Sequence, residues 1–154
     1  MRRKDKQITD HSELESIIAN AQVCRIGLAL NDMPYIVPVN FGYNNNCLFF
    51  HSTHKGKKID IIKQNNNVCF EIDIDTGIIT NSENLCKATM KYRSVIGTGR
   101  AFFITDISEK RRALETIVKH YIPEERFEFD ERLFKMVEVI KIEIASITGK
   151  QSGH

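Results

Sequence analysis

The sequence lacks several features, and each absence argues against a class of protein. The four cysteines are widely spaced and form no C-x-x-C pair, so the ligand spacing of a structural zinc site is missing. No apolar run approaches the ~20 residues with which a helix spans a bilayer. The net charge of +2 is too small an excess to indicate nucleic-acid binding. A metal ion, a membrane and a nucleic acid are therefore not expected as partners.

The length of 154 residues fits one domain with a hydrophobic core and leaves no room for a second. The amino-terminal residues are charged with no apolar core behind them, so no signal peptide is expected. Three cysteines fall in apolar, strand-like runs, where a reduced thiol acts as a small hydrophobe, and Cys86 is a background thiol in a loop. We predict a single cytoplasmic domain over residues 1–154. Its basic arm, residues 1–9, is loose or lies along a partner surface.

The apolar pattern predicts a mainly β fold with flanking helices. Alternating and β-branched residues predict strands over 23–30, 35–43, 47–51, 68–75, 92–104 and 137–147, the first three forming a meander. Asn31-Asp32 and Asn44 to Asn46 provide the turn residues of the meander. Residues 76–90 are expected to form a loop, with a helical turn near 83–88. Glycines at 97 and 99 indicate a bulge or a close backbone approach in the fifth strand.

Helices are predicted over 10–21, 56–64 and 108–121, with a further turn at 131–134. Asp10 and Ser108 are the expected amino-terminal caps, and Pro123 stops the third helix. Six strands joined by short connections predict an antiparallel six-stranded sheet. Closure of that sheet into a barrel would remove its exposed edges.

The stretch from Tyr35 to Lys58 is the best candidate for a binding site. Two apolar strands are followed by Gly56-Lys57-Lys58 at the start of a predicted helix, with hydroxyls at Ser52 and Thr53. A phosphate is bound by backbone N–H groups at a helix start, with little side-chain bulk nearby and cationic donors. The stretch therefore suits an aromatic ring that carries a phosphate. Taken alone, the lysines are more typical of a solvated helix face, and no Walker loop is present.

Several motifs at matching spacing resemble the FMN-binding split-barrel family of the pyridoxamine 5'-phosphate oxidases. Phe50-His51-Ser52 followed by Gly56-Lys57-Lys58 resembles the family's phosphate segment. The closer resemblance is to the nitroimidazole-resistance subgroup. It rests on Val37 to Tyr43 (VPVNFGY), on SVIGTG from Ser94, on the basic opening RRKD and on ITGK at 147–150. The resemblance extends from Met1 to Lys150 and implies a six-stranded split barrel that binds FMN.

The resemblance also implies a role for each matching residue. The isoalloxazine edge would lie against the backbone of Pro38, Val39, Asn40 and Phe41. His51 and Ser52 would lie beside the ring and the ribityl chain, Lys57 and Lys58 would bind the phosphate, and Ser94 would come from a neighbouring strand. In the family this site lies at a twofold interface, so a homodimer with FMN between its subunits is expected.

The chain departs from the oxidases in two places. Lys57 stands where they commonly have arginine, and a lysine cannot form a bidentate fork with phosphate, so a weaker grip is expected. The carboxy-terminal basic-aromatic pattern that binds pyridoxamine phosphate in the oxidases is missing, which argues against that substrate.

His51 is the best candidate for chemistry, because an imidazole beside a redox ring can donate or accept a proton. The alternative is a histidine that only packs the flavin. Other polar residues are expected to be structural. His54 and His120 are assigned to the surface, the alternating Glu71, Asp73 and Asp75 to the solvated side of an edge strand, and Arg93 and Arg100 to ion pairs or a pocket mouth.

Three functional hypotheses follow. The first is a homodimeric FMN-dependent reductase of small oxidised or nitroaromatic compounds, served by a small-molecule electron donor. The second is a module that binds flavin or haem without turnover. The third is an interaction domain whose basic arm binds a partner.

Overall fold

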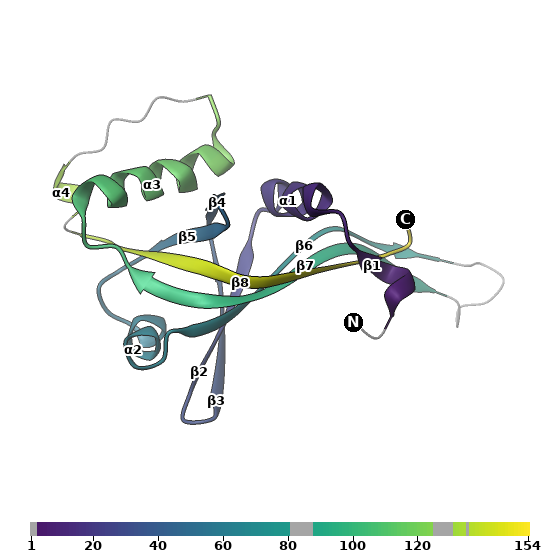
Figure 1. The fold of residues 1–154 in the computed structure, drawn as a ribbon, viewed down its shortest axis with the longest axis horizontal. Helices are drawn as coiled ribbons and strands as arrows, with labels where there is room; N and C mark the ends of the chain where they lie inside the picture. The colour runs from purple at the N-terminus through teal and green to yellow at the C-terminus, as the bar shows by residue number, and fades with distance from the viewer. Residues whose placement is uncertain (1–2, 81–87, 125–130, 135) are drawn as a thin grey trace.

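The computed structural model describes residues 3–80, 88–124, 131–134 and 136–154. A strongly curved antiparallel sheet forms its centre, and helices pack against the sheet (Figure 1). In chain order the elements are the 3-10 turn η1 (Lys4–Lys6), β1 (Gln7–Ile8), α1 (His11–Asn20), β2 (Cys24–Leu30), β3 (Met33–Val39), β4 (Gly42–Asn44), β5 (Cys47–Ser52), α2 (Lys57–Gln64), β6 (Asn67–Ile79), β7 (Thr89–Phe103), α3 (Ile107–Tyr121), α4 (Glu131–Phe134) and β8 (Glu138–Ser152).

The strands form one eight-stranded sheet in the order β3-β2-β6-β7-β8-β5-β4, with β1 paired to β8. β3 and β4 stand at the two ends of this order, yet only Asn40 and Phe41 separate them in the chain. The sheet must therefore curve until its two ends meet at this corner. No hydrogen-bonded pairing joins β3 to β4 within the described residues. The structure confirms a mainly β split barrel with flanking helices, with eight strands instead of six, and split instead of closed.

The predicted second strand and the meander are wrong in one respect. The run over 35–43 breaks at Asn40 and Phe41 into two strands that belong to opposite ends of the sheet. β3 pairs with β2, and β4 pairs with β5, so both predicted hairpins form, but they lie at opposite ends of the sheet order instead of side by side in a meander. The turns themselves are as predicted. Asn31, Asp32, Asn45 and Asn46 all have positive φ, as tight hairpins need.

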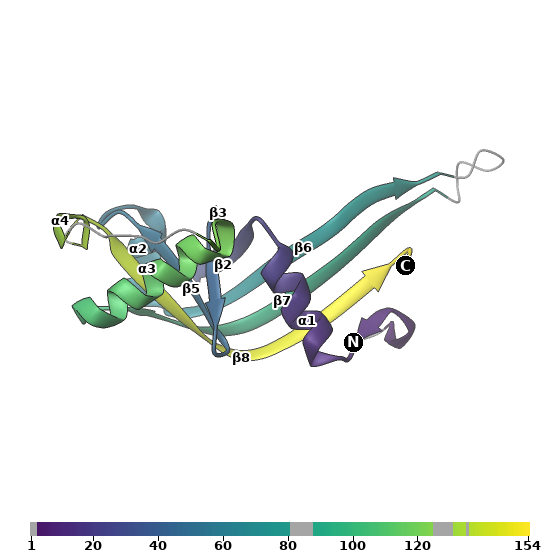
Figure 2. The same ribbon diagram turned by 90° about the horizontal axis from the view of Figure 1, so that it is seen from above.

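β6 and β7 form a hairpin that extends beyond the barrel, which Figure 2 shows from above. Residues 77–79 pair with residues 89–91, so the predicted loop over 76–90 is wrong at both of its ends. The predicted helical turn at 83–88 and Cys86 lie outside the described residues, apart from Ala88. The register shift between Thr98 and Gly99 places the extra residue, Ala145, in β8, so the bulge lies opposite the glycines. The close backbone approach is confirmed, because a Cβ at Gly99 would clash with the Glu143 carbonyl oxygen.

The amino-terminal arm is tied to its own chain over the described residues. β1 pairs with residues Gly149 and Lys150 of β8, and Ile8 is buried. Lys6 Nζ donates to Ser152 Oγ at 2.7 Å. The prediction of a loose or partner-bound arm is therefore wrong for Lys6 to Ile8.

The helices begin where polar side chains satisfy their first N–H groups. The Asp10 carboxylate accepts from the Ser12 amide at 3.0 Å, which confirms the predicted cap of α1. α3 is capped by Asp106, which accepts from the Glu109 amide at 2.8 Å, so the prediction of Ser108 as the cap is wrong. α3 packs against β4 and β5, α1 against β6 and β7, and α2 against β2.

The barrel interior is filled by the inward side chains of the strands and by the apolar faces of α1 and α2. Phe41, Phe50 and Phe70 are its largest fully buried side chains. A second buried cluster, which includes Leu114 and Val139, lies between α3 and the sheet. The two clusters hold β5 from both sides, and β5 leads directly into the candidate site.

Candidate functional site

The connection from β5 to α2 (Thr53 to Gly56) presents the predicted phosphate segment. Gly56 precedes α2 with a φ of 129°, a conformation that disfavours residues with a Cβ. The Ile59 and Asp60 amides donate to the Gly56 carbonyl, so the N–H groups at the open amino-terminal end of α2 are those of Lys57 and Lys58. Lys57 and Lys58 follow at once, with Lys57 exposed and Lys58 half-buried. A backbone donor set and two ammonium groups therefore share this end of α2.

Ser52 ends β5 directly before this connection. Its side chain is buried, with 7% exposure, and its Oγ lacks a hydrogen-bond partner among the described residues. A buried hydroxyl without a partner costs free energy, and in a native protein it indicates a bound ligand or water. A phosphate oxygen near α2 would satisfy it, so this residue fits a phosphorylated cofactor.

Lys57 also contacts β3, upstream of the corner from Pro38 to Phe41 that the resemblance assigns to the flavin ring. Its Nζ lies 4.7 Å from the ring centroid of Tyr35 on β3. This cation–π contact connects the start of α2 with β3. The contact places the Lys57 ammonium group beside β3.

The corner between β3 and β4 holds Pro38, Val39, Asn40 and Phe41. Pro38 and Asn40 are exposed, Val39 is half-buried and Phe41 is buried in the core. The Phe41 amide donates to Tyr121 Oη at 2.9 Å. The Phe41 amide is therefore already used in a hydrogen bond, and backbone contacts to a flavin edge would come from the other residues of this corner.

His51 lies on the opposite face of β5 from Ser52, because neighbouring residues of a strand alternate. It is exposed and stands opposite Val139 of β8. Ser94 is half-buried on β7, and β8 separates β7 from β5 in the sheet order. Within one chain, the His51 side chain therefore lies on the other face of the sheet from that of Ser52, and Ser94 lies two strands away from Ser52.

An apolar concavity is formed by residues on the outer face of β2, β3, β6 and β7. Its volume is about 830 Å³, and Arg100 is among the lining residues. Ile36 is 67% exposed and Ile96 is 53% exposed on this face. Such an apolar patch on a protein surface marks an interaction or ligand site.

A charged groove of about 620 Å³ adjoins this face and is also bordered by Arg25. Arg25 donates to Glu71 at 2.9 Å and contacts Asp73, while Arg93 Nε donates to Asp75 at 2.7 Å. Burial raises the pKa of Glu71, and Arg93 lowers the pKa of Asp75.

Several predictions about polar residues are settled by these contacts. The expected ion pair of Arg93 is confirmed, whereas Arg100 lines the apolar concavity. Glu71 does not lie on a sheet edge, because β6 pairs there with both β2 and β7, whereas Asp73 and Asp75 lie beyond the residues of β6 that pair with β2. His120 is not a surface group: its Nε2 donates to the Ala21 carbonyl at 2.7 Å, and its ring lies 4.4 Å from that of Phe41. No group of three metal-ligating side chains is found in the part of the chain that the structure describes.

Sequence reasoning missed Glu138 and Tyr121. His54 Nδ1 lies 2.8 Å from Glu138 Oε1, across 84 positions of the chain. Tyr121 meets the Phe41 corner across 80 positions. Only the tertiary fold brings these residues together, and no local signal marks them.

Comparison with known proteins gives the family. The family model described as pyridoxamine 5'-phosphate oxidase matches residues 10–151. The chain belongs to this family. The predicted family and its nitroimidazole-resistance subgroup are thereby confirmed, since the chain is also similar to a candidate 5-nitroimidazole antibiotic resistance protein from Bacteroides thetaiotaomicron. That structure is 36% identical with a TM-score of 0.83, over 94% of this chain and 85% of the other.

Solved structures of lower sequence identity match as well. The flavocytochrome Anf3 from Azotobacter vinelandii is 19% identical with a TM-score of 0.86, over 100% of this chain and 72% of the other. The FAD and heme binding protein from Mycobacterium smegmatis is 16% identical with the same TM-score, over 97% and 74%. At these identities the likeness shows the fold. A curated relative, an uncharacterised protein from Rhizobium meliloti, is 29% identical over 66 residues, 43% of each chain.

No helix in the described ranges is long and apolar enough to cross a membrane.

Proposed function

We propose that the protein binds FMN between two copies of the chain and uses it to reduce a small oxidised compound. The observation that carries the cofactor is the buried, unpartnered Ser52 Oγ beside the amino-terminal end of α2. Lys57 and Lys58 add positive charge at the same end, as a phosphate monoester requires. The corner from Pro38 to Phe41 would take the edge of the ring.

The apolar outer face supports the second copy. Exposed Ile36 and Ile96 on a concave face are costly in water and are covered when two such faces meet. Ser94 lies on the same outer side of β7 and is remote from Ser52 in the strand order. A partner's copy of this strand, brought across a twofold axis, would therefore supply the Ser94 contact that one chain cannot.

The bound flavin would supply hydride or electron transfer. Similarity to a candidate 5-nitroimidazole resistance protein supports a nitroaromatic or another small oxidised compound as acceptor. His51 is exposed and stands one residue before Ser52, so its imidazole can exchange a proton with substrate or solvent. We expect the electron donor to be a small reductant such as a nicotinamide nucleotide.

The test begins with the chromophore. Purified protein should be yellow, should release FMN on denaturation, and should bind FMN more tightly than riboflavin or FAD. A colourless protein without affinity for any flavin would overturn the proposal. Anaerobic mixing with reduced nicotinamide and then with a nitroaromatic should reduce and reoxidise the flavin. A flavin that binds but is never reduced would identify a non-catalytic module that binds flavin or haem.

A further inference from the structure

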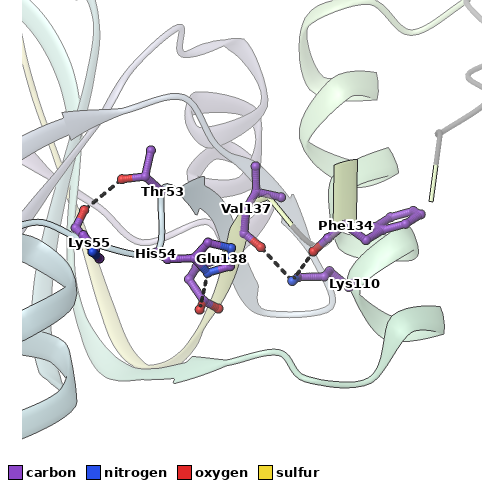
Figure 3. Close-up of polar contacts among 7 residues, drawn as sticks. All are labelled: Thr53, His54, Lys55, Lys110, Phe134, Val137 and Glu138. Carbon is purple, nitrogen blue, oxygen red and sulfur yellow. Dashed lines mark hydrogen bonds and ion pairs between the residues drawn. The ribbon is translucent and has the colours of Figure 1, made fainter. Parts of the chain in front are cut away.

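We propose that His54 and Glu138 are positioning residues that hold the phosphate-binding end of α2 in place. The inference rests on the flavin function proposed above. Figure 3 shows the contact: His54 Nδ1, on the connection after β5, lies 2.8 Å from Glu138 Oε1 at the start of β8. The two side chains are 46% and 25% exposed, so water screens the pair only in part.

The Glu138 end of this contact is firmly fixed. Glu138 pairs with Ser52 in the β5–β8 ladder, so its backbone is held directly opposite the buried hydroxyl. The preceding residue, Val137, accepts a hydrogen bond from Lys110 Nζ at 2.7 Å, and Phe134 accepts a second at 2.8 Å (Figure 3). Lys110 is buried on α3, so its ammonium ties the entry of β8 to that helix. A rigid anchor therefore stands beside the connection.

The His54 end lies on a short connection that needs such an anchor. Thr53 Oγ1 donates to the Lys55 carbonyl at 2.8 Å, which folds this segment into a local turn (Figure 3). Gly56 follows with positive φ, and a Cβ placed there would meet nothing within 4 Å. Packing at Gly56 therefore restrains the chain little. The His54–Glu138 contact joins a side chain of this connection to the start of β8, a part of the sheet that is distant in sequence.

The consequence falls on the phosphate. Lys57 and Lys58 directly follow Gly56. A movement of the connection therefore moves both ammonium groups and the first N–H groups of α2. A binding constellation that is loose by about 1 Å loses much of its affinity. We therefore expect the loss of His54 or Glu138 to weaken the binding of the phosphate and to spare the ring.

The test compares FMN with riboflavin, which has the same ring and ribityl chain without the phosphate. In H54A and in E138Q the dissociation constant for FMN should rise about five- to tenfold, and that for riboflavin should change by less than about twofold. The double variant should bind FMN no more weakly than either single variant, because each single variant removes the same contact. H54N, which puts an amide nitrogen where Nδ1 stands, should keep most of the FMN affinity. H11A is the matched control, since His11 also faces a glutamate, Glu15, at 3.8 Å on the exposed side of α1.

The outcomes separate the two proposals. Wild-type protein that binds no flavin, or binds FMN no better than riboflavin, would overturn the proposed phosphate site and this inference with it. Wild-type protein that prefers FMN, with the same preference retained in H54A and E138Q, would overturn the positioning role alone. Equal losses for FMN and riboflavin would also overturn it, because they would reflect general damage to the fold.

Discussion

Tyr121 Oη, at the end of α3, accepts a hydrogen bond from the Phe41 amide at 2.9 Å and donates to the Gln22 carbonyl at 3.1 Å. Phe41 stands where the two ends of the sheet meet, and Gln22 leads from α1 into β2. Burial raises the pKa of the phenol, so it stays protonated and able to donate at neutral pH. One hydroxyl thus connects the corner between β3 and β4 with the segment that enters β2.

Tyr121→Phe should therefore destabilise the protein. It leaves the amide of a buried residue without a partner, which costs about 1–3 kcal/mol of the free energy of unfolding. Urea titration followed by circular dichroism measures this loss. Tyr43→Phe is the control, because Tyr43 Oη meets Glu15 at 3.1 Å on the exposed side and its loss should cost under about 0.5 kcal/mol. Equal losses in the two variants would contradict the role given to Tyr121.

Gly42→Ala should disturb the packing of α3 on the barrel. A Cβ at Gly42 would stand 2.6 Å from the Thr116 carbonyl carbon and oxygen, which are backbone atoms of α3 and cannot rotate away. Overpacking of this kind costs about 1–3 kcal/mol. Gly77→Ala is the matched control, since a Cβ there would meet nothing within 4 Å. Thermal unfolding should show a lower midpoint for Gly42→Ala alone; two equal midpoints would mean that α3 shifts at little cost.

Local chemistry made much of the fold predictable. Asn31-Asp32 and Asn45-Asn46 were identified from residue type, because asparagine and aspartate tolerate positive φ. The helix after Gly56 and its end near Asn65 also follow from residues close in sequence. The break at Asn40 and Phe41 could not be predicted, since the apolar alternation continues through it. The bond from Tyr121 and the burial of Phe41 act there from a distance.

The candidate site was predictable to the same extent. Ser52, Lys57 and Lys58 are close in sequence, and the structure places them at one end of α2. The partner of His54 was not, because Glu138 approaches only through the pairing of β5 with β8. The long β6–β7 hairpin was missed because its outer residues, such as Gly77 and Thr89, lack an alternating apolar pattern and are held by the ladder alone.

The paired substitution Lys57→Ala with Lys58→Ala should weaken FMN binding through the phosphate. Each lost charged hydrogen bond should cost about 1.5–3 kcal/mol of the binding free energy, and riboflavin binding should be nearly unchanged. Fluorescence titration at low and high salt measures this, and the effect should be larger at low salt. Lys63→Ala, at the exposed far end of α2, is the control. An unchanged FMN affinity would remove the two lysines from the site.

The cysteines should differ in reactivity. Cys24 is fully buried and burial raises the pKa of its thiol to about 12, whereas Cys69 is exposed on β6. Alkylation of native protein at about pH 8 should therefore spare Cys24, whereas Cys69, which lines the apolar face that a second copy would cover, should react only where that face is open. The unfolded chain ionises Cys24 at its ordinary pKa, so its contribution to stability is present at neutral pH and is lost as the pH rises from about 9 toward 12. Peptide mass spectrometry reads the labelling; rapid modification of Cys24 in folded protein would show that β2 opens.

His51→Ala should separate binding from turnover. The side chain is exposed on the face of β5 away from Ser52, so its removal should leave the FMN affinity within about threefold, consistent with a surface substitution. If His51 transfers a proton during reduction of the acceptor, turnover should fall by about 10²–10⁴-fold, the usual contribution of a general acid or base. Anaerobic stopped-flow reoxidation of the reduced flavin by a nitroaromatic measures this step, with His11→Ala as the control. Turnover equal to that of the wild type would restrict His51 to packing and leave proton supply to solvent.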